Sequence, residues 1–176
     1  KSNYSITETG YAQYQVVDDQ GTDGTDTLSN IETLRFADQN FDITPSGQKL
    51  EGDSSDDTLE GAAGDDFIYG YGGNDILVGK SGADDMRGGT GNDTYYVDNI
   101  GDQITEIDGA GTDMIRSFID FDLANAEHVE NLELLGSGNL NGTGNNSANI
   151  IKGNSGTNIL IGLGGHDILV GKSGAD

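Results

Sequence analysis

The sequence is poor in the residues that usually hold a domain of this length together. Its 176 residues include no cysteine, no tryptophan and a single proline, and only 33% of them are hydrophobic. Disulfides are therefore excluded, and the apolar content is low for a conventional globular core. Basic residues are also scarce, because 8 lysines and arginines face 31 acidic residues, for a formal net charge of −23. A compact state at this charge needs cations that offset the self-repulsion.

These absences also exclude classes of partner. The negative charge argues against nucleic acid and against anionic membrane surfaces as direct partners. No apolar run approaches the roughly 18 residues of a membrane span, so no membrane insertion is expected. The first ten residues, KSNYSITETG, lack the apolar core of a secretory signal.

Glycine and aspartate are abundant instead, and they recur at a fixed period. From Gly52 the chain divides without a gap into GDSSDDTLE, GAAGDDFIY, GYGGNDILV, GKSGADDMR and GGTGNDTYY. Every block of nine begins with glycine. The sixth residues are Asp57, Asp66, Asp75, Asp84 and Asp93, and the eighth are Leu59, Ile68, Leu77, Met86 and Tyr95.

A second array begins at Gly144 in the same frame, with GNNSANIIK, GNSGTNILI, GLGGHDILV and the partial block GKSGAD. Its sixth residues are Asn149, Asn158, Asp167 and Asp176. The stretch GGNDILVGKSGAD at 72–84 returns almost unchanged at 164–176, which suggests that array plus spacer is a larger repeating unit. Because the last block stops midway, we expect the sequence to be a fragment.

The residue types at each position of a block predict its local structure. Glycines in the first half permit the positive φ of a tight turn, and the last three residues suit a very short strand with one apolar side chain facing inward. A single block cannot bury that side chain alone, whereas stacked blocks can. The pattern therefore predicts a solenoid.

The five blocks from Gly52 resemble the GGxGxDxUx nonapeptides of the RTX family, the calcium-binding repeats of proteins exported by type I secretion in Gram-negative bacteria. The resemblance implies an all-β fold, a right-handed parallel β-roll or β-solenoid in which residues 18 apart lie above one another. Asp57 would then lie under Asp75, Asp75 under Asp93, and Asp66 under Asp84. About three well-formed calcium sites are implied in the first array.

The resemblance also implies the calcium ligands, which are sixth-position side chains and carbonyl oxygens of the turns. The implied metal-binding residues are Asp57, Asp66, Asp75, Asp84, Asp93, Asp167, Asp176, Asn149, Asn158, Asp53, Ser55, Ala62, Gly64, Gly70, Tyr71, Gly72, Gly73, Gly79, Ser81, Gly88, Thr90, Gly162 and Gly164. Calcium prefers six to eight hard oxygens, which such turns supply. The first block lacks glycine at its second and fourth positions, so its site is expected to be weaker. The asparagines leave two readings open, a calcium site or a metal-free hydrogen-bonded ladder.

Four segments are expected. They are a β-rich N-terminal segment with one repeat-like turn (1–47), a first β-roll (50–97), a β-rich spacer (98–143) and a second β-roll cut off mid-repeat (144–176). The repeat-like turn is GTDGTDTLS, with Asp26 sixth, and the run DTLSNIETLRFAD that follows resembles a segment often found beside RTX arrays. YAQYQVV is expected to be a strand, and Pro45 to Gly47 a linker. In the spacer we expect strands and turns that continue the roll, including a partial turn ending at Asp113. A short helix within LANAEHVENLEL is the alternative.

The sequence gives little support for phosphate binding, zinc binding or catalysis. GKS at 79–81 is no phosphate loop, because Asn74 stands where the first glycine of that motif belongs. His128, between glutamates and without cysteine, is a poor zinc constellation, and His166 occupies a variable turn position. No catalytic triad is apparent, so we expect no enzyme here. Two further alternatives are disorder, against which the regular blocks argue, and a calcium-free solenoid, which would not need the repeated aspartate.

Taken with the resemblance, these features predict a calcium-binding segment of a secreted or cell-surface bacterial protein. It would stay extended in a calcium-poor cytosol, pass the type I secretion machinery and fold on extracellular Ca²⁺. It would thereby support the secretion, stability or presentation of the parent protein. One alternative is a structural adhesin or surface-layer repeat that self-associates through calcium. Another is an accessory domain of a secreted protease, lipase, peroxidase or haemolysin.

Overall fold

The computed structural model describes residues 47–174 and 176 throughout and, before them, the backbone of five strands. β1 (Tyr4–Gly10), β2 (Gln13–Asp18) and β3 (Thr25–Ser29) form an antiparallel sheet, and β4 (Thr33–Arg35) pairs antiparallel with β5 (Asn40–Asp42). The strand expected in YAQYQVV corresponds to β2. β3, which contains Asp26, pairs antiparallel with β2 and so differs from a stacked nonapeptide. The expected turn at 21–24 and the expected linker at 45–46 lie outside the described residues.

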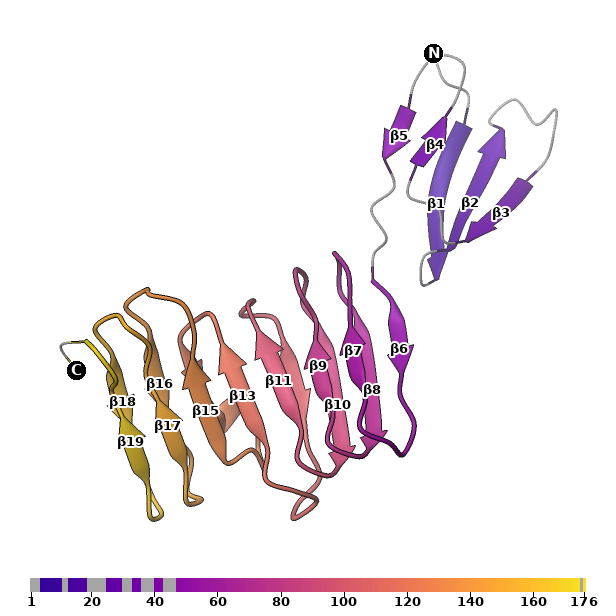
Figure 1. Cartoon of the computed structure of the whole chain (residues 1–176). Coiled ribbons are helices and arrows are strands. Elements are labelled where there is room, and N and C mark those ends of the chain that lie inside the picture. Colours follow the sequence, from indigo (N-terminus) through magenta and orange to yellow (C-terminus); the bar gives the residue numbers. More distant parts are fainter. Residues whose placement is uncertain are drawn as a thin grey trace.

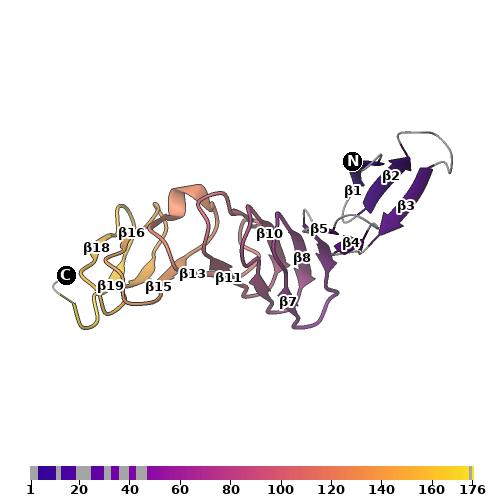
Figure 2. The same ribbon diagram turned by 90° about the horizontal axis from the view of Figure 1, so that it is seen from above.

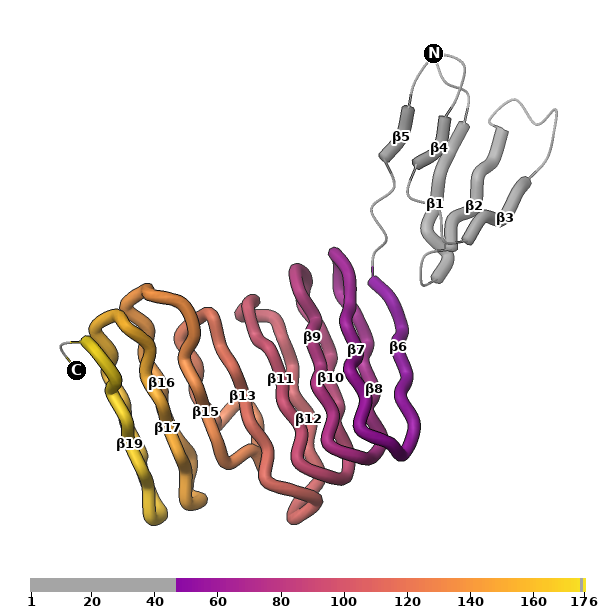
Figure 3. The backbone as a smooth tube through the Cα atoms, in the orientation of Figure 1, coloured from indigo at the N-terminus to yellow at the C-terminus, as the bar shows by residue number. Residues whose placement is uncertain are grey.

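From β6 onward the chain winds into a parallel β-solenoid (Figure 1), and the tube in Figure 3 follows its successive coils. One sheet has four strands, β6 (Lys49–Glu51), β8 (Phe67–Gly72), β10 (Asp85–Thr90) and β12 (Gln103–Thr105). The second has seven, β7 (Thr58–Glu60), β9 (Ile76–Val78), β11 (Thr94–Val97), β13 (Met114–Ser117), β15 (Asn131–Leu134), β17 (Ile150–Lys152) and β19 (Ile168–Val170). A third has three, β14 (Phe121–Asp122), β16 (Asn141–Thr143) and β18 (Ile159–Ile161).

The register of the first array confirms two nonapeptides per coil. Ile68 pairs with Met86, and Leu77 pairs with Tyr95, so each residue lies beside its counterpart 18 positions later. These four eighth-position side chains are completely buried and form the centre of the hydrophobic core. The predicted inward-facing position is therefore confirmed. Because neighbouring coils supply the burial, a single block would have no core of its own.

The coil continues through the spacer with less regular length. Partners are 20 residues apart between β11 and β13, 17 between β13 and β15, and 19 between β15 and β17. The coil between β13 and β15 contributes Leu123, Ala126 and Val129 to the core, and β15 contributes Leu134; all four are fully buried.

A single short 3-10 helix, η1 (Leu123–Asn125), breaks the strands and turns of the described spacer (Figure 2). It covers the first three residues of LANAEHVENLEL, so the short helix considered above is confirmed there, while the end of the stretch forms β15. The Asp122 carboxylate caps η1 by accepting the Ala124 N–H at 2.9 Å, which ends the preceding strand. In the part of the chain that is described, no helix has the length and apolar character needed to cross a membrane.

Candidate metal centre

Two rows of oxygen-bearing side chains run along the edges of the solenoid. In one row, each residue directly precedes a strand of the seven-stranded sheet. Its members are Asp57, Asp75, Asp93, Asp113, Glu130, Asn149 and Asp167. The row on the opposite edge precedes β8, β10 and β12. Its members are Asp66, Asp84 and Asp102. The coil thus brings together the sixth-position residues that the sequence places 18 apart.

From Asp75 and Asp84 onward, a hydrogen-bond ladder between coils fixes one oxygen of the carboxylates in these rows. The backbone N–H of Asp57 donates to Oδ1 of Asp75 at 2.8 Å, and that of Asp75 donates to Oδ1 of Asp93 at 2.7 Å. On the opposite edge Asp66 donates to Oδ1 of Asp84 at 2.8 Å. Each bond joins one coil to the next, so the carboxylate is held in place by the backbone of the preceding coil.

The second carboxylate oxygen distinguishes two kinds of turn. In the turns 70–75, 79–84 and 88–93, here called open turns, the buried Oδ2 of the aspartate finds no hydrogen-bond partner among the described residues. In the closed turns, 52–57 and 61–66, the corresponding Oδ2 accepts the N–H of the second turn residue at 2.8 Å. An unpartnered buried carboxylate oxygen is costly, so the open turns call for a further group.

Backbone conformation at the second turn residue follows the same division. Tyr71 and Lys80 have φ of 73° and 68°, and Gly89 has φ of 103°, whereas Asp53 and Ala62 in the closed turns are not in this left-handed region. A left-handed backbone costs a non-glycine residue roughly 1–2 kcal/mol. Two of the open turns, at Tyr71 and Lys80, therefore keep a strained backbone that leaves the carboxylate oxygen free, as functional sites often do.

In open and closed turns alike, the first glycine makes room for this oxygen, because a Cβ added to Gly52 or Gly61 would also meet the aspartate Oδ2. A Cβ added to Gly70 would collide with Asp75 Oδ2 and would lie 2.8 Å from the carbonyl oxygen of Gly88 in the next coil. At Gly79 an added Cβ would likewise collide with Asp84 Oδ2. Oxygens from two coils therefore converge above Gly70. These oxygens repel one another when no cation lies between them, and together they suit a hard divalent ion.

Burial raises the pKa of the aspartate in each of the three open turns. It raises the pKa of Asp84 to about 6, partly opposed by the hydrogen bond with the Asp66 backbone and reinforced by the charge of Asp102. Burial likewise raises the pKa of Asp75 and of Asp93. Without a cation the folded coil thus disfavours their ionised forms, and a bound cation would reverse that preference.

In the asparagine turns, 144–149 and 153–158, the side-chain amide of the sixth residue forms hydrogen bonds through both its oxygen and its nitrogen. Asn149 Nδ2 donates to the Glu130 carbonyl at 3.0 Å and to Asn145 Oδ1 at 3.1 Å, while its Oδ1 accepts the Asn145 N–H at 2.8 Å. Asn158 repeats the pattern, because it donates to the Leu140 carbonyl at 2.7 Å. In both turns an amide N–H points at a carbonyl of the preceding coil.

The remaining predicted ligands lie in the turns or at the ends of β8 and β10, and their role in calcium binding stays a prediction. One edge holds Asp53, Ser55, Gly70, Tyr71, Gly72, Gly73, Gly88, Thr90, Gly162 and Gly164, and the opposite edge holds Ala62, Gly64, Gly79 and Ser81. Two of their carbonyls already accept bonds between coils, Asp53 from Gly72 at 3.1 Å and Ser81 from Gly64 at 2.8 Å. Asp167 and Asp176 each accept one such bond through Oδ1, at 3.0 and 2.9 Å.

Sequence reasoning missed Asp102. The segment 97–105 reads VDNIGDQIT, which keeps aspartate sixth and the buried Ile104 eighth but begins with valine. Its carboxylate accepts the N–H of Asp84 at 3.1 Å and, through the other oxygen, the N–H of Asn99 at 3.1 Å. The spacing of nine from Asp93 was the signal that would have identified it.

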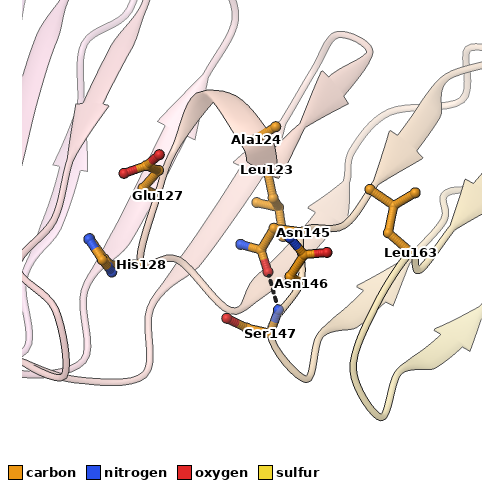
Figure 4. A pocket seen from close by; sticks show the side chains of 8 residues that line it. All are labelled: Leu123, Ala124, Glu127, His128, Asn145, Asn146, Ser147 and Leu163. Atoms are coloured by element: carbon orange, nitrogen blue, oxygen red, sulfur yellow. Dashed lines mark hydrogen bonds between the residues drawn. The ribbon is translucent and has the colours of Figure 1, made fainter.

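A shallow pocket of about 320 Å³ lies beside η1, between Glu127 and His128 on one side and the turn at Asn145 on the other (Figure 4). Its hydrogen bond from the Ser147 N–H to Asn145 Oδ1, at 2.9 Å, belongs to the asparagine turn itself. His128 Nδ1 lies 3.6 Å from an oxygen of the exposed Asp108. This pocket does not bring together ligands for a transition metal.

Buried, backbone-anchored carboxylates facing turn carbonyls of the next coil define a cation-binding β-solenoid. The family of RTX calcium-binding nonapeptide repeats, described in four copies, matches residues 51–86, 72–99 and 143–176. These segments belong to that family, as the sequence predicts. A search of curated proteins finds no match to the chain. The repeats form a structural, calcium-binding β-roll that is not catalytic by itself.

Proposed function

We propose that this segment folds on binding extracellular Ca²⁺ and thereby supports the protein that carries it. The observation that carries the proposal is the buried Oδ2 atom of Asp75, Asp84 and Asp93, for which the described residues supply no hydrogen-bond donor. Proteins of the RTX family are secreted, which supports an extracellular setting and export by a type I system. Extracellular calcium-binding modules have affinities of roughly 0.1–1 mM, within reach of extracellular concentrations.

The open turns are the proposed binding sites. Asp75 and Asp93 on one edge, and Asp84 on the other, would each supply a carboxylate oxygen, and turn carbonyls such as that of Gly88 would supply neutral ligands. When bound, Ca²⁺ offsets the charge that these oxygens bring together. Because binding requires two coils side by side, its free energy is available only to the folded state.

The asparagine turns are proposed to be metal-free. Asn149 and Asn158 carry no charge, and their amide N–H groups donate to the carbonyls of Glu130 and Leu140, which a cation would otherwise face. The second array would then combine calcium-independent coils with the turn at Asp167. The spacer 98–143 is proposed to link the two arrays by continuing the coil.

Circular dichroism during a calcium titration tests the proposal. We expect an unfolded spectrum in chelator and a cooperative rise of β signal as Ca²⁺ reaches roughly millimolar concentration. The Asp75→Asn, Asp84→Asn, Asp93→Asn triple variant should require far more Ca²⁺ to give the same signal. An identical folded spectrum in chelator and in Ca²⁺ would overturn the proposal.

A further inference from the structure

Three buried carboxylates meet where the regular blocks give way to the spacer. Asp93 precedes β11, Asp113 precedes β13 and Glu106 follows β12. One oxygen of each lies within 4.8 Å of an oxygen of the other two. Asp93 and Asp113 are each 1% exposed and Glu106 is 7% exposed, so solvent scarcely screens their charges.

The surrounding groups do not neutralise this cluster. Asp93 Oδ1 accepts the Asp75 N–H, but Asp93 Oδ2 has no hydrogen-bond partner within the described part of the chain. Glu106 accepts bonds from the Tyr95 hydroxyl and from the Ile107 N–H, the latter at 3.1 Å. Among the described residues, no salt bridge involves any of the three carboxylates. A side chain that is almost fully buried thus directs a free oxygen into the cluster.

The sequence produces the cluster through two departures from the repeat. Glu106 stands 18 residues after Gly88, where a regular block would begin with glycine. The following turn is two residues longer than a regular one, so Asp113 rather than residue 111 accepts the Asp93 N–H, at 2.8 Å. A Cβ on Gly88 would meet Asp93 Oδ2 and the Tyr95 hydroxyl, whereas one on Gly70 would meet a carboxylate and a backbone carbonyl. Side-chain oxygens therefore take the place of a turn carbonyl.

We propose that Asp93, Glu106 and Asp113 together bind one Ca²⁺ that fastens the first spacer coil to the first array. This inference rests on the proposed function and names the ligands of the Asp93 turn. An all-oxygen set without histidine or cysteine suits calcium or magnesium rather than zinc. Because three carboxylates bring more charge than an open turn with one or two, this site binds calcium more tightly than the other open turns. The junction coil is accordingly the first to become ordered as calcium rises.

Calorimetric calcium titration of the whole segment, comparing wild type with Glu106→Gln, tests the inference. Glutamine keeps the size of the side chain but removes its charge. We expect the tightest binding event to weaken by at least about tenfold while the weaker events persist. Glu127→Gln, on the exposed surface of the same spacer, is the matched control and should bind as wild type. Equal affinities and equal stoichiometry in wild type and Glu106→Gln would overturn the inference, as would equally tight binding of Mg²⁺.

Terbium luminescence excited through tyrosine gives a second readout. Because the Tyr95 hydroxyl contacts Glu106, Tb³⁺ bound in the cluster should be sensitised by Tyr95. Tyr95→Phe keeps all three carboxylates, so it should keep the calcium stoichiometry but lose the tightest luminescent phase. Retained luminescence in Tyr95→Phe would contradict the site. Absence of any calcium binding by wild type would instead defeat the proposed function as a whole.

Discussion

The backbone N–H of Asp66 donates to Oδ1 of Asp84 at 2.8 Å, from one coil to the next, while Oδ2 of Asp84 has no partner among the described residues. One hydrogen bond thus orients the carboxylate through Oδ1 and leaves its second oxygen available to bind a cation. The preceding coil does the positioning, so the arrangement exists only when both coils are formed. This relationship couples ion binding to stacking and underlies the predictions that follow.

Replacing Asp84 by asparagine should remove one bound calcium ion per chain. The amide places a neutral oxygen or an N–H where the free Oδ2 lies, and it removes the charge that a hard cation requires. Asp85→Asn is the matched control, because it removes the same charge from a side chain that pairs with Arg87 at 2.7 Å on the outside of β10. Calorimetric stoichiometry distinguishes the two variants, and equal ion counts would speak against the open-turn assignment.

Asn149→Ala should destabilise the calcium-loaded protein without changing how many ions it binds. It removes the amide donor to the Glu130 carbonyl and leaves the Asn145 N–H without its acceptor. Losing a partner of a buried polar group costs about 1–3 kcal/mol. Asn146→Ala, exposed in the same turn, should change the free energy of unfolding by less than about 0.5 kcal/mol. Should Asn149→Ala instead bind one ion fewer, the asparagine turn is a calcium site.

Replacing the second turn residue by glycine should change the free energy of unfolding in opposite directions in an open and in a closed turn. Lys80→Gly should raise the free energy of unfolding in saturating calcium by about 1 kcal/mol, because glycine adopts φ of 68° without strain. The Lys80–Glu60 pair that is lost is exposed, at 3.8 Å, and contributes little. Ala62→Gly, at the same position of a closed turn, should lower it by about 0.4–1 kcal/mol. Denaturant titrations measure both, and shifts of the same sign would contradict the turn classification.

The pH dependence of stability should reverse when calcium is added. Burial raises the pKa of Asp84 and of Asp113 to about 6, and that of Glu106 to about 7, above the values of about 4 expected in the unfolded chain. Their contribution to stability is therefore fully present below about pH 4 and is lost as the pH rises through 6 to 7.

In chelator, acidification from pH 7.5 to 4.5 should then favour folding. In saturating calcium the same change should weaken it, because protons compete with Ca²⁺ for the same oxygens. Thermal melts followed by circular dichroism at several pH values provide the measurement. Parallel pH profiles with and without calcium would be inconsistent with carboxylates as the ligands.

Much of the solenoid could be predicted because its period is written directly in the sequence. Glycine first, aspartate sixth and an apolar residue eighth were enough to place Ile68 beside Met86 and Asp66 beside Asp84. Asp102 was missed because Val97 replaces the first glycine, which ended the visible pattern one block early. The coil itself tolerates that change, since Ile104 still fills the core.

The division into open and closed turns could not be predicted in the same way. It depends on φ at the second turn residue, and Tyr71 and Lys80 adopt the left-handed value although neither is glycine. Glu106 was likewise not identified, because it occupies a position of the repeat where glycine is expected, and only the coil brings it to Asp93. Local sequence fixes the short strands, whereas stacking between coils decides which oxygens remain free.

Anomalous X-ray diffraction from crystals grown in abundant calcium tests the central claim most directly, because it locates each ion. We expect peaks next to Oδ2 of Asp75, Asp84 and Asp93, and none within the asparagine turns at Asn149 and Asn158. Well-ordered coils without a peak beside any of these three aspartates would contradict the account.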